Sequence, residues 1–143
     1  MDAFDADVLI YAATPDHPLG RRVEALFASG PVADEDPPAG LGSVLLLPEL
    51  LAKPTRDRAD DELAAIAALL GRLDLRPVDL ATATIATALG AAYRLSAVDA
   101  VHLATAVQMG ATRFLTNNKR DFSQSITEVD VTYPSDLPDP AAG

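Results

Sequence analysis

The sequence predicts an α/β protein in which a mainly parallel sheet is covered by helices on both faces. Two observations support this prediction: short apolar runs recur along the chain, and segments with apolar residues at helical spacing separate them. Strands joined in this way through right-handed crossovers lie parallel to one another. With 143 residues the chain fits one ordinary domain, predicted over residues 1–133 and followed by a flexible tail over residues 134–143.

The first strand is predicted at Ala3–Ile10, where an apolar run begins beside two carboxylates. Alternate residues of a strand share a face, so Asp5 and Asp7 would point together while the following apolar residues fill the buried side. A helix with an apolar stripe is predicted next, at Pro18–Ala28. The chain therefore opens with a strand that carries acids and a helix that covers the sheet.

A second buried strand is predicted at Ser43–Leu47, after a loop rich in proline and glycine. Pro48 suits the first turn of a helix, which would place Glu49 near the start of that helix. Leucine and isoleucine recur at helical spacing in Asp60–Leu73, which predicts a longer amphipathic helix. A short strand at Leu75–Val78 completes the first half of the chain.

The second half is predicted to contain two helices and two strands. The helices are expected at Leu80–Arg94 and Val98–Met109, and the second is apolar on most faces and therefore buried. Strands are expected at Thr112–Thr116 and Thr127–Thr132, with a turn or short helix at Lys119–Phe122 between them. Ligands of such sheets bind beyond the carboxyl ends of the strands, where several acids of this chain are predicted to lie.

The composition limits the chemistry that the chain can perform. It has no cysteine, so a bound metal would need oxygen ligands or one of the two histidines, His17 and His102, which favours Mg²⁺ or Mn²⁺. The longest apolar runs fall far short of the roughly 20 residues that span a bilayer. No signal-like pattern opens the chain, so a cytoplasmic protein without a membrane partner is expected.

The formal charge of −10 argues against nonspecific long-range attraction to nucleic acid. A nucleic-acid substrate stays compatible with it, because exposed charges are screened over roughly 8 Å at physiological salt. Basic residues beside a site can therefore outweigh a distant acidic face. Lys53 and Arg56 follow Glu49 in the sequence, and Lys119 and Arg120 adjoin Asn118.

Four places in the chain carry acids that could converge: Asp5 with Asp7, Glu49, Asp99 and Asp121. Each has a structural explanation as well, since an acid near a helix start is favourable and Ser96 with Asp99 fits a capping box. Two carboxylates about 4 Å apart repel by roughly 4 kcal/mol at an effective dielectric near 20. Convergence therefore requires protonation, hydrogen-bond donors or a divalent cation, and a cation could activate water and orient a phosphodiester.

Four motifs together resemble the PIN-domain family, particularly the VapC-type toxin ribonucleases. They are F-D-A-D-V-L-I-Y at the start, L-P-E-L, S-A-V-D-A-V-H-L-A-T-A, and F-L-T-N-N-K-R-D-F near the end. Each is weak alone, and their order and spacing make the signal specific. The resemblance implies a three-layer α/β/α sandwich with a mainly parallel central sheet and a metal-dependent nuclease site.

By motif position, Asp5, Glu49 and Asp99 correspond to the first three acidic residues of the family. The fourth position departs from the pattern: Asn118 stands where many relatives have Asp, which keeps an oxygen ligand and removes a charge. Asp121 is expected to supply the missing carboxylate, directly or through water.

The remaining polar residues of the motifs are given supporting roles. Thr116 would orient water or phosphate, and Asp7 would be a supporting or additional ligand. His102 follows Asp99 by one helical turn and is expected to be a packed, hydrogen-bonded histidine, with a hydrogen bond to a neighbouring carboxylate as the alternative.

The resulting hypothesis is a small Mg²⁺- or Mn²⁺-dependent endoribonuclease, the toxin of a toxin–antitoxin pair. Its catalytic acids would be Asp5, Glu49, Asp99 and Asp121, with Asn118 as a further metal ligand, and the four basic residues above would contact the RNA backbone. The resemblance also suggests a homodimer and a cognate antitoxin. Two alternatives stay open: a haloacid-dehalogenase-like phosphatase with Asp5 as nucleophile and Asp7 as general acid/base, and a PIN-fold binding module whose site is weakened by Asn118.

Overall fold

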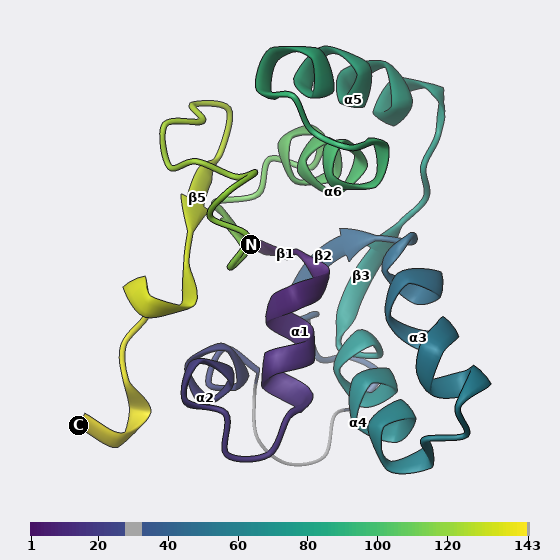
Figure 1. Ribbon diagram of the computed structural model, residues 1–143, viewed down its shortest axis with the longest axis vertical. Helices are drawn as coiled ribbons and strands as arrows, with labels where there is room; N and C mark the ends of the chain where they lie inside the picture. Colours follow the sequence, from purple (N-terminus) through teal and green to yellow (C-terminus); the bar gives the residue numbers. More distant parts are fainter. Residues whose placement is uncertain (28–32, 143) are drawn as a thin grey trace.

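The computed structural model describes residues 1–27 and 33–142 of the chain (Figure 1). Within these residues, one parallel sheet has the strand order β3-β2-β1-β4-β5. The strands are β1 (Asp2–Phe4), β2 (Gly40–Ser43), β3 (Leu73–Arg76), β4 (Arg113–Leu115) and β5 (Asp130–Thr132). The helices are α1 (Ala6–Ala13), α2 (Pro18–Glu24), α3 (Leu46–Arg56), α4 (Asp60–Leu70), α5 (Leu80–Tyr93) and α6 (Ala97–Gln108), followed by the 3₁₀ turns η1 (Pro134–Asp136) and η2 (Pro140–Ala142).

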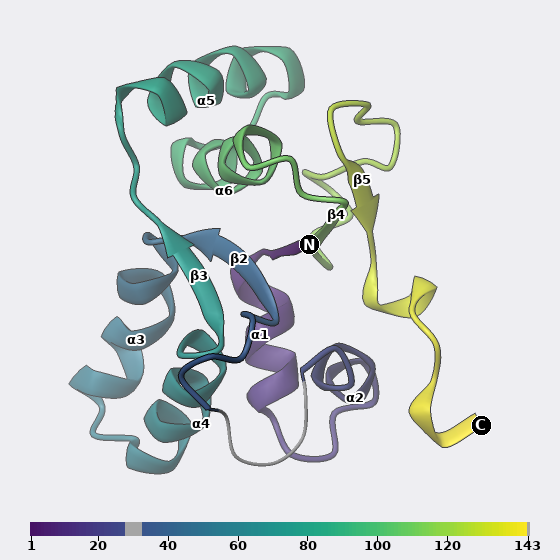
Figure 2. The ribbon, with the colours of Figure 1, turned by 180° about the vertical axis from the view of Figure 1, so that it is seen from behind.

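The elements form three layers, with α1–α4 on one face of the sheet and α5 and α6 on the other (Figure 1; Figure 2). Successive strand residues enter opposite cores: Ala3 packs with the α5 and α6 side, and Phe4 with the α1–α4 side. The same alternation places Phe114 and Leu115 of β4 in the two cores. The predicted α/β/α sandwich with a parallel sheet is confirmed.

The prediction of one long strand at Ala3–Ile10 is wrong after Phe4. Asp5 has an extended backbone, and its Oδ1 accepts a hydrogen bond from the Ala6 N–H at 2.8 Å, so Asp5 caps helix α1. Val8 and Leu9 are both buried, as neighbouring residues of a packed helix can be. Asp5 and Asp7 therefore do not share a strand face, because a short apolar run cannot be assigned to strand or helix by periodicity alone.

The second strand begins earlier than the predicted Ser43–Leu47, because it consists of Gly40–Ser43. Its glycines are required by close packing: a Cβ on Gly40 would lie 2.5 Å from the backbone oxygen of Asp2, and one on Gly42 would lie 2.5 Å from Leu46 Cδ1. Glycine is a poor strand former, so the strand was hidden in the sequence. Residues from Leu46 onward form α3, which confirms a helix with Pro48 in its first turn.

Other predicted boundaries differ from the observed ones by a few residues. Helix α4 ends at Leu70 instead of Leu73, because the chain turns at Gly71 and Leu73 starts β3. That strand begins two residues before the predicted one. Strand β5 is shorter than predicted and begins at Asp130. Helix α2 ends at Glu24, whereas the predicted end at Ala28 lies outside the described residues.

The helices of the second half match their predictions closely. Helix α6 begins at Ala97, and Ser96 Oγ accepts a hydrogen bond from the Asp99 N–H at 3.3 Å, which confirms the predicted cap. Helix α6 packs between α5 and the sheet, which explains its apolar character (Figure 2). Across the ranges 1–27 and 33–142, no helix is long and apolar enough to cross a membrane.

The segment predicted as a flexible tail starts by packing on the domain. Leu137 is buried in the core beneath α1–α4, and Arg22 Nη1 in α2 donates a hydrogen bond to its carbonyl oxygen at 2.8 Å. Residues 134–137 therefore contact the fold, whereas Gly143 lies outside the described residues.

Candidate metal centre

The site forms at the carboxyl edge of the sheet, where the strand order reverses. Strand β1 lies between β2 and β4, and the chain leaves β1 at Asp5 and β4 at Thr116. The backbones are joined there, because the Asp5 N–H donates to the carbonyl oxygen of Leu115 at 2.9 Å. Such a reversal point is the usual ligand-binding position in an open α/β sheet.

A tight group of potential metal ligands consists of Asp5, Glu49 and His102. One ligand atom from each lies within 4.8 Å of the others. Asp5 comes from the end of β1, Glu49 from the first turn of α3 and His102 from the middle of α6, so both helical layers reach this edge. His102 Nε2 lies 2.7 Å from Glu49 Oε2. Asp5 and His102 are buried, whereas Glu49 is partly open to solvent.

Asp5 is a buried carboxylate with several polar partners. Its Oδ1 accepts from the Ala6 N–H, and its Oδ2 accepts from Thr116 Oγ1 at 2.8 Å. Burial nevertheless raises the pKa of Asp5 above its ordinary value, although the charge of His102 and both hydrogen bonds act in the opposite direction. Asp5 therefore sits where an added positive charge would stabilise its ionised form.

Asp7 lies in the first turn of α1 and fixes the loop that follows β4. Its Oδ2 accepts a hydrogen bond from the Asn117 N–H at 3.0 Å, and its Oδ1 is buried without a hydrogen-bond partner among the described residues. Burial, followed by the charge of Asp5, raises the pKa of Asp7 to about 7. The Asn117 side chain donates to the Tyr11 hydroxyl at 3.3 Å, which ties the same loop to α1 a second time.

The other two predicted acids approach this group from its open side. Burial raises the pKa of Asp99, and the charges of Asp121 and Glu49 add to that effect, so these carboxylates lie close enough to interact. The Asp121 N–H donates to Asn118 Oδ1 at 3.2 Å, and Asn118 Nδ2 donates to Asp121 Oδ2 at 3.0 Å. Asn118 and Asp121 therefore form a reciprocal pair, and both stand outside the tight three-residue group.

The donor set fits a hard divalent cation. Ligands on opposite sides of Mg²⁺ lie about 4.2 Å apart, given bond lengths of 2.0–2.1 Å, so a spread of 4.8 Å is close to what one ion requires. The raised pKa values of Asp5 and Asp99 record the repulsion and desolvation that a cation would offset. The carboxylate oxygens of this group match the preferences of Mg²⁺ and Mn²⁺.

The basic residues predicted to bind substrate are exposed. Lys53 and Arg56 occupy the last turn of α3, where Arg56 Nε contacts Asp57 Oδ1 at 3.0 Å. Lys119 and Arg120 lie in the turn after β4, and Lys119 Nζ stands 5.2 Å from the centre of the Tyr133 ring. Their role in binding substrate stays a prediction.

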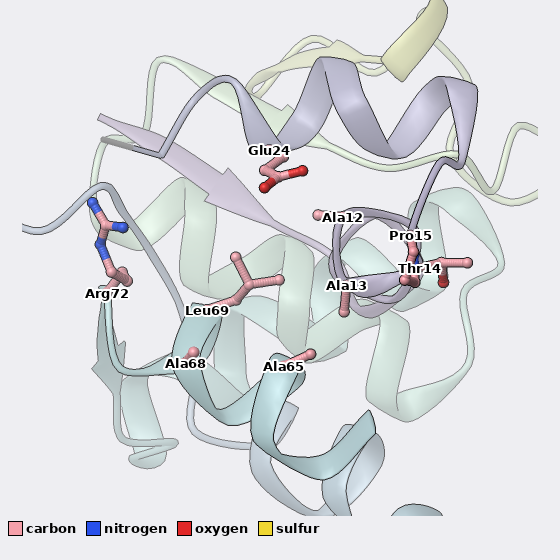
Figure 3. A pocket seen from close by; sticks show the side chains of 9 residues that line it. All are labelled: Ala12, Ala13, Thr14, Pro15, Glu24, Ala65, Ala68, Leu69 and Arg72. Atoms are coloured by element: carbon pink, nitrogen blue, oxygen red, sulfur yellow. The ribbon is translucent and has the colours of Figure 1, made fainter. Parts of the chain in front are cut away.

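A groove of about 530 Å³ lies elsewhere on the described surface, between α1, α2 and α4 (Figure 3). Alanine side chains of α1 and α4 form much of its wall, with Leu69, Glu24 and Arg72 around them. The candidate ligands Asp5, Glu49 and His102 do not line it, so the groove is separate from the metal centre.

The contacts of two residues at the site were not fully expected from the sequence. His102 was expected mainly as a packed histidine, and the structure shows it both fully buried and bonded to Glu49, which was the alternative. Its spacing of one turn from Asp99 was the available signal. Asn117 was missed, because its main contact with Asp7 is made by a backbone N–H and leaves no mark in the residue types.

The sequence model of the PIN domain matches residues 3–125. The chain therefore belongs to the PIN domain family. PIN domains are generally nucleases and typically use a divalent metal ion. No curated protein matches the chain. Membership of the PIN domain family argues against the alternative of a haloacid-dehalogenase-like phosphatase. In that alternative Asp7 would be the general acid/base, whereas in the structure its Oδ2 accepts a hydrogen bond from the Asn117 N–H.

Three solved structures share the fold at low sequence identity. A toxin–antitoxin complex from Klebsiella pneumoniae has a TM-score of 0.70 and 22% identity, and the match covers 94% of this chain and 98% of that one. VapBC2 from Rickettsia felis, bound to a DNA fragment from its promoter, has a TM-score of 0.66 and 15% identity, with 92% and 97% covered. FitAB bound to the IR36 DNA fragment has a TM-score of 0.64 and 21% identity, with 96% and 98% covered.

Proposed function

We propose that this PIN domain is a metal-dependent endoribonuclease that hydrolyses RNA phosphodiester bonds. The observation that carries the proposal is the convergence of Asp5, Glu49 and His102 within 4.8 Å at the carboxyl edge of the sheet, with Asp99 close enough to interact. A buried carboxylate beside other acids has little use in a purely structural site, because its charge opposes folding. A bound divalent cation, Mg²⁺ or Mn²⁺, would offset the repulsion between these carboxylates.

Each residue of the cluster has a distinct task in this proposal. Asp5, Glu49 and Asp99 would hold the ion, with Asp121 and Asn118 completing the open side. The ion would supply charge neutralisation at the phosphate and a more acidic water nucleophile. Thr116 keeps the Asp5 carboxylate oriented, since its Oγ1 donates to Asp5 Oδ2 and also accepts from the Asn118 N–H at 3.1 Å. Asp7 fixes the loop that bears Thr116 and Asn118.

RNA is the proposed substrate, and the exposed basic residues support this choice locally. Lys53, Arg56, Lys119 and Arg120 would contact backbone phosphates on either side of the scissile bond. Because the net charge is −10, binding should depend on these few contacts and weaken as salt is added. Single-stranded RNA fits this limited electrostatic support better than a long duplex, whose phosphates would also face acidic surface.

The direct test is cleavage of mixed single-stranded RNAs by the purified protein with Mg²⁺ or Mn²⁺. The matched control is the double variant Asp5→Asn/Asp99→Asn, which removes two charges and keeps similar side-chain shapes. We expect endonucleolytic fragments with the parent protein and metal, and none with the variant or with a chelator. Negligible cleavage by both proteins, together with retained RNA binding, would instead favour the alternative of a binding module weakened by Asn118.

We further propose that the chain is the toxin of a cytoplasmic toxin–antitoxin pair and forms a homodimer. Support comes from the PIN fold and from its likeness to toxin–antitoxin complexes. An antitoxin peptide with basic side chains would complement the acidic cluster. Induced expression in a bacterial host should arrest growth, whereas the Asp5→Asn/Asp99→Asn variant should not. Light scattering after size exclusion should give a mass near twice the 15.0 kDa of one chain.

A further inference from the structure

Within the metal centre, the side chain of His102 is fully enclosed. His102 has no exposed side-chain surface and lies in α6 among Leu103, Ala104 and other core residues. Burying an imidazole in such surroundings is unfavourable unless it is hydrogen-bonded. Its partner is Glu49 of α3, across the edge of the sheet from α6.

The geometry of this contact is that of a hydrogen bond and not of two ligands on one ion. Adjacent ligands of a metal with bonds of 2.0–2.1 Å lie about 3.0 Å apart. His102 Nε2 and Glu49 Oε2 are only 2.7 Å apart, which suits a hydrogen bond to a carboxylate. The other ring nitrogen, Nδ1, is buried and has no partner among the described residues. A carboxylate oxygen only accepts a hydrogen bond, so Nε2 carries the hydrogen and donates it to Glu49.

We propose that His102 is a positioning residue that holds the Glu49 carboxylate in the orientation needed to bind the divalent ion. The inference rests on the proposed metal centre and adds a residue to it. Glu49 is partly open to solvent, at 34% side-chain exposure, and the fully buried ring fixes one of its oxygens. The second oxygen stays available for the ion. Without the ring, the Glu49 side chain would sample other rotamers. The entropy lost in ordering this side chain when the ion binds would then weaken ion binding.

The experiment measures Mn²⁺ binding by calorimetry on the full chain, together with the unfolding temperature of the metal-free protein. His102→Leu removes the donor and keeps an apolar side chain in the core. His102→Gln keeps an N–H near the position of Nε2, whereas the amide of His102→Asn is too short to reach Glu49. Thr105→Val is the matched control, because Thr105 is buried on the same helix and donates only to the Val101 carbonyl oxygen.

We expect His102→Leu and His102→Asn to weaken Mn²⁺ binding by about 10- to 100-fold, and His102→Gln to stay within about threefold of the parent. Thr105→Val should lower only the unfolding temperature. In a Glu49→Gln background, His102→Leu should change the affinity by less than about twofold, because the carboxylate that it positions is gone. If His102→Leu does not fold, the Mn²⁺ affinities of His102→Gln and His102→Asn decide the test.

Two results would overturn the inference while leaving the metal centre intact. Parent-like Mn²⁺ affinity in both His102→Leu and His102→Asn would show that Glu49 needs no support. Equal weakening in Thr105→Val would show that the effect belongs to core packing. Absence of Mn²⁺ binding by the parent protein is a different result, because it would remove the proposed function and this inference with it.

Discussion

Helix α1 joins two regions of opposite character. Its first turn carries Asp7 and follows Asp5, so this end belongs to the acidic cluster. Its last turn helps to form the groove of about 530 Å³ between α2 and α4, whose walls are mostly alanine and leucine (Figure 3). The groove offers one acid and one base for chemistry, Glu24 and Arg72. The acidic cluster gathers carboxylates from the end of β1, from α3 and from α6.

The comparison shows that a convergence of charge and a surface hollow lie at opposite ends of one helix. In the acidic region, burial and neighbouring charges raise the pKa values of Asp5, Asp7 and Asp99, so the fold holds groups there that oppose its own stability. A region that a fold keeps at the expense of stability is a better candidate for function than one that is merely hollow.

The largest effect should follow the change Asp5→Asn. The amide keeps the cap on α1 but cannot supply the buried charge to a cation, so ribonuclease activity should fall by about 100-fold or more. The unfolding temperature of the metal-free protein should stay level or rise by a few degrees, because a desolvated carboxyl is removed. Activity assays and thermal unfolding of the same preparations measure both effects. If Asp5→Asn lost stability and kept its activity, Asp5 would be a structural residue and the acidic end of α1 would not be the functional one.

A smaller effect, a gain in metal affinity, should follow Asn118→Asp, which places a carboxylate at the position where the resemblance to the family leads us to expect one. The new carboxylate adds charge beside Asp121, so Mn²⁺ affinity should rise by about tenfold, equivalent to 1.4 kcal/mol. The hydrogen bond from Asn118 Nδ2 to Asp121 is lost, so the metal-free protein should unfold at a lower temperature. Calorimetric titration and thermal unfolding in chelator separate the two effects. Unchanged affinity would mean that position 118 does not face the ion.

The third prediction concerns the pH dependence of stability at the acidic end of α1. The pKa of Asp7 is about 7 in the folded protein, against an ordinary value of 3.8, so between these values the folded state binds a proton that the unfolded state lacks. Raising the pH from 4 towards 7 should therefore lower the stability of the metal-free protein. Asp7→Asn should reduce this slope, with Asp5 and Asp99 supplying the remainder. Denaturant unfolding in chelator across this range is the measurement, and an identical slope in the variant would refute the assignment.

The fold could be predicted from the sequence because its apolar periodicities are strong where packing is simple. Helices α5 and α6 and strand β4 were placed within two residues of their observed ends. The failures came from competing local effects. Asp5 ends a strand by capping a helix, which an apolar run cannot reveal, and Gly40 serves close backbone packing in a strand that propensity disfavours.

The candidate site was predictable in its residues and not in its geometry. Motif order singled out Asp5, Glu49 and Asp99, and the approach of Asp5 to Glu49 was expected because both residues follow strands that end at one edge of the sheet. The hydrogen bond between His102 and Glu49 joins α6 to α3, and its partners are 53 residues apart in sequence. No local pattern encodes such a contact, because it depends on how two helices flank the sheet.

The smallest effect should come from the groove, and its size tests whether the two ends of α1 are independent. Ala68 of α4 lines the groove and is exposed, and the neighbouring Ala67 is exposed without lining it, so Ala67→Gln is a matched control for Ala68→Gln. Each change should alter the unfolding free energy by less than about 0.5 kcal/mol, because surface substitutions on a helix rarely do more. Ribonuclease activity should stay within about twofold for both, because neither contacts the acids. A tenfold loss confined to Ala68→Gln would show that the groove communicates with the cluster through α1, whose Asp7 and Tyr11 both hold Asn117.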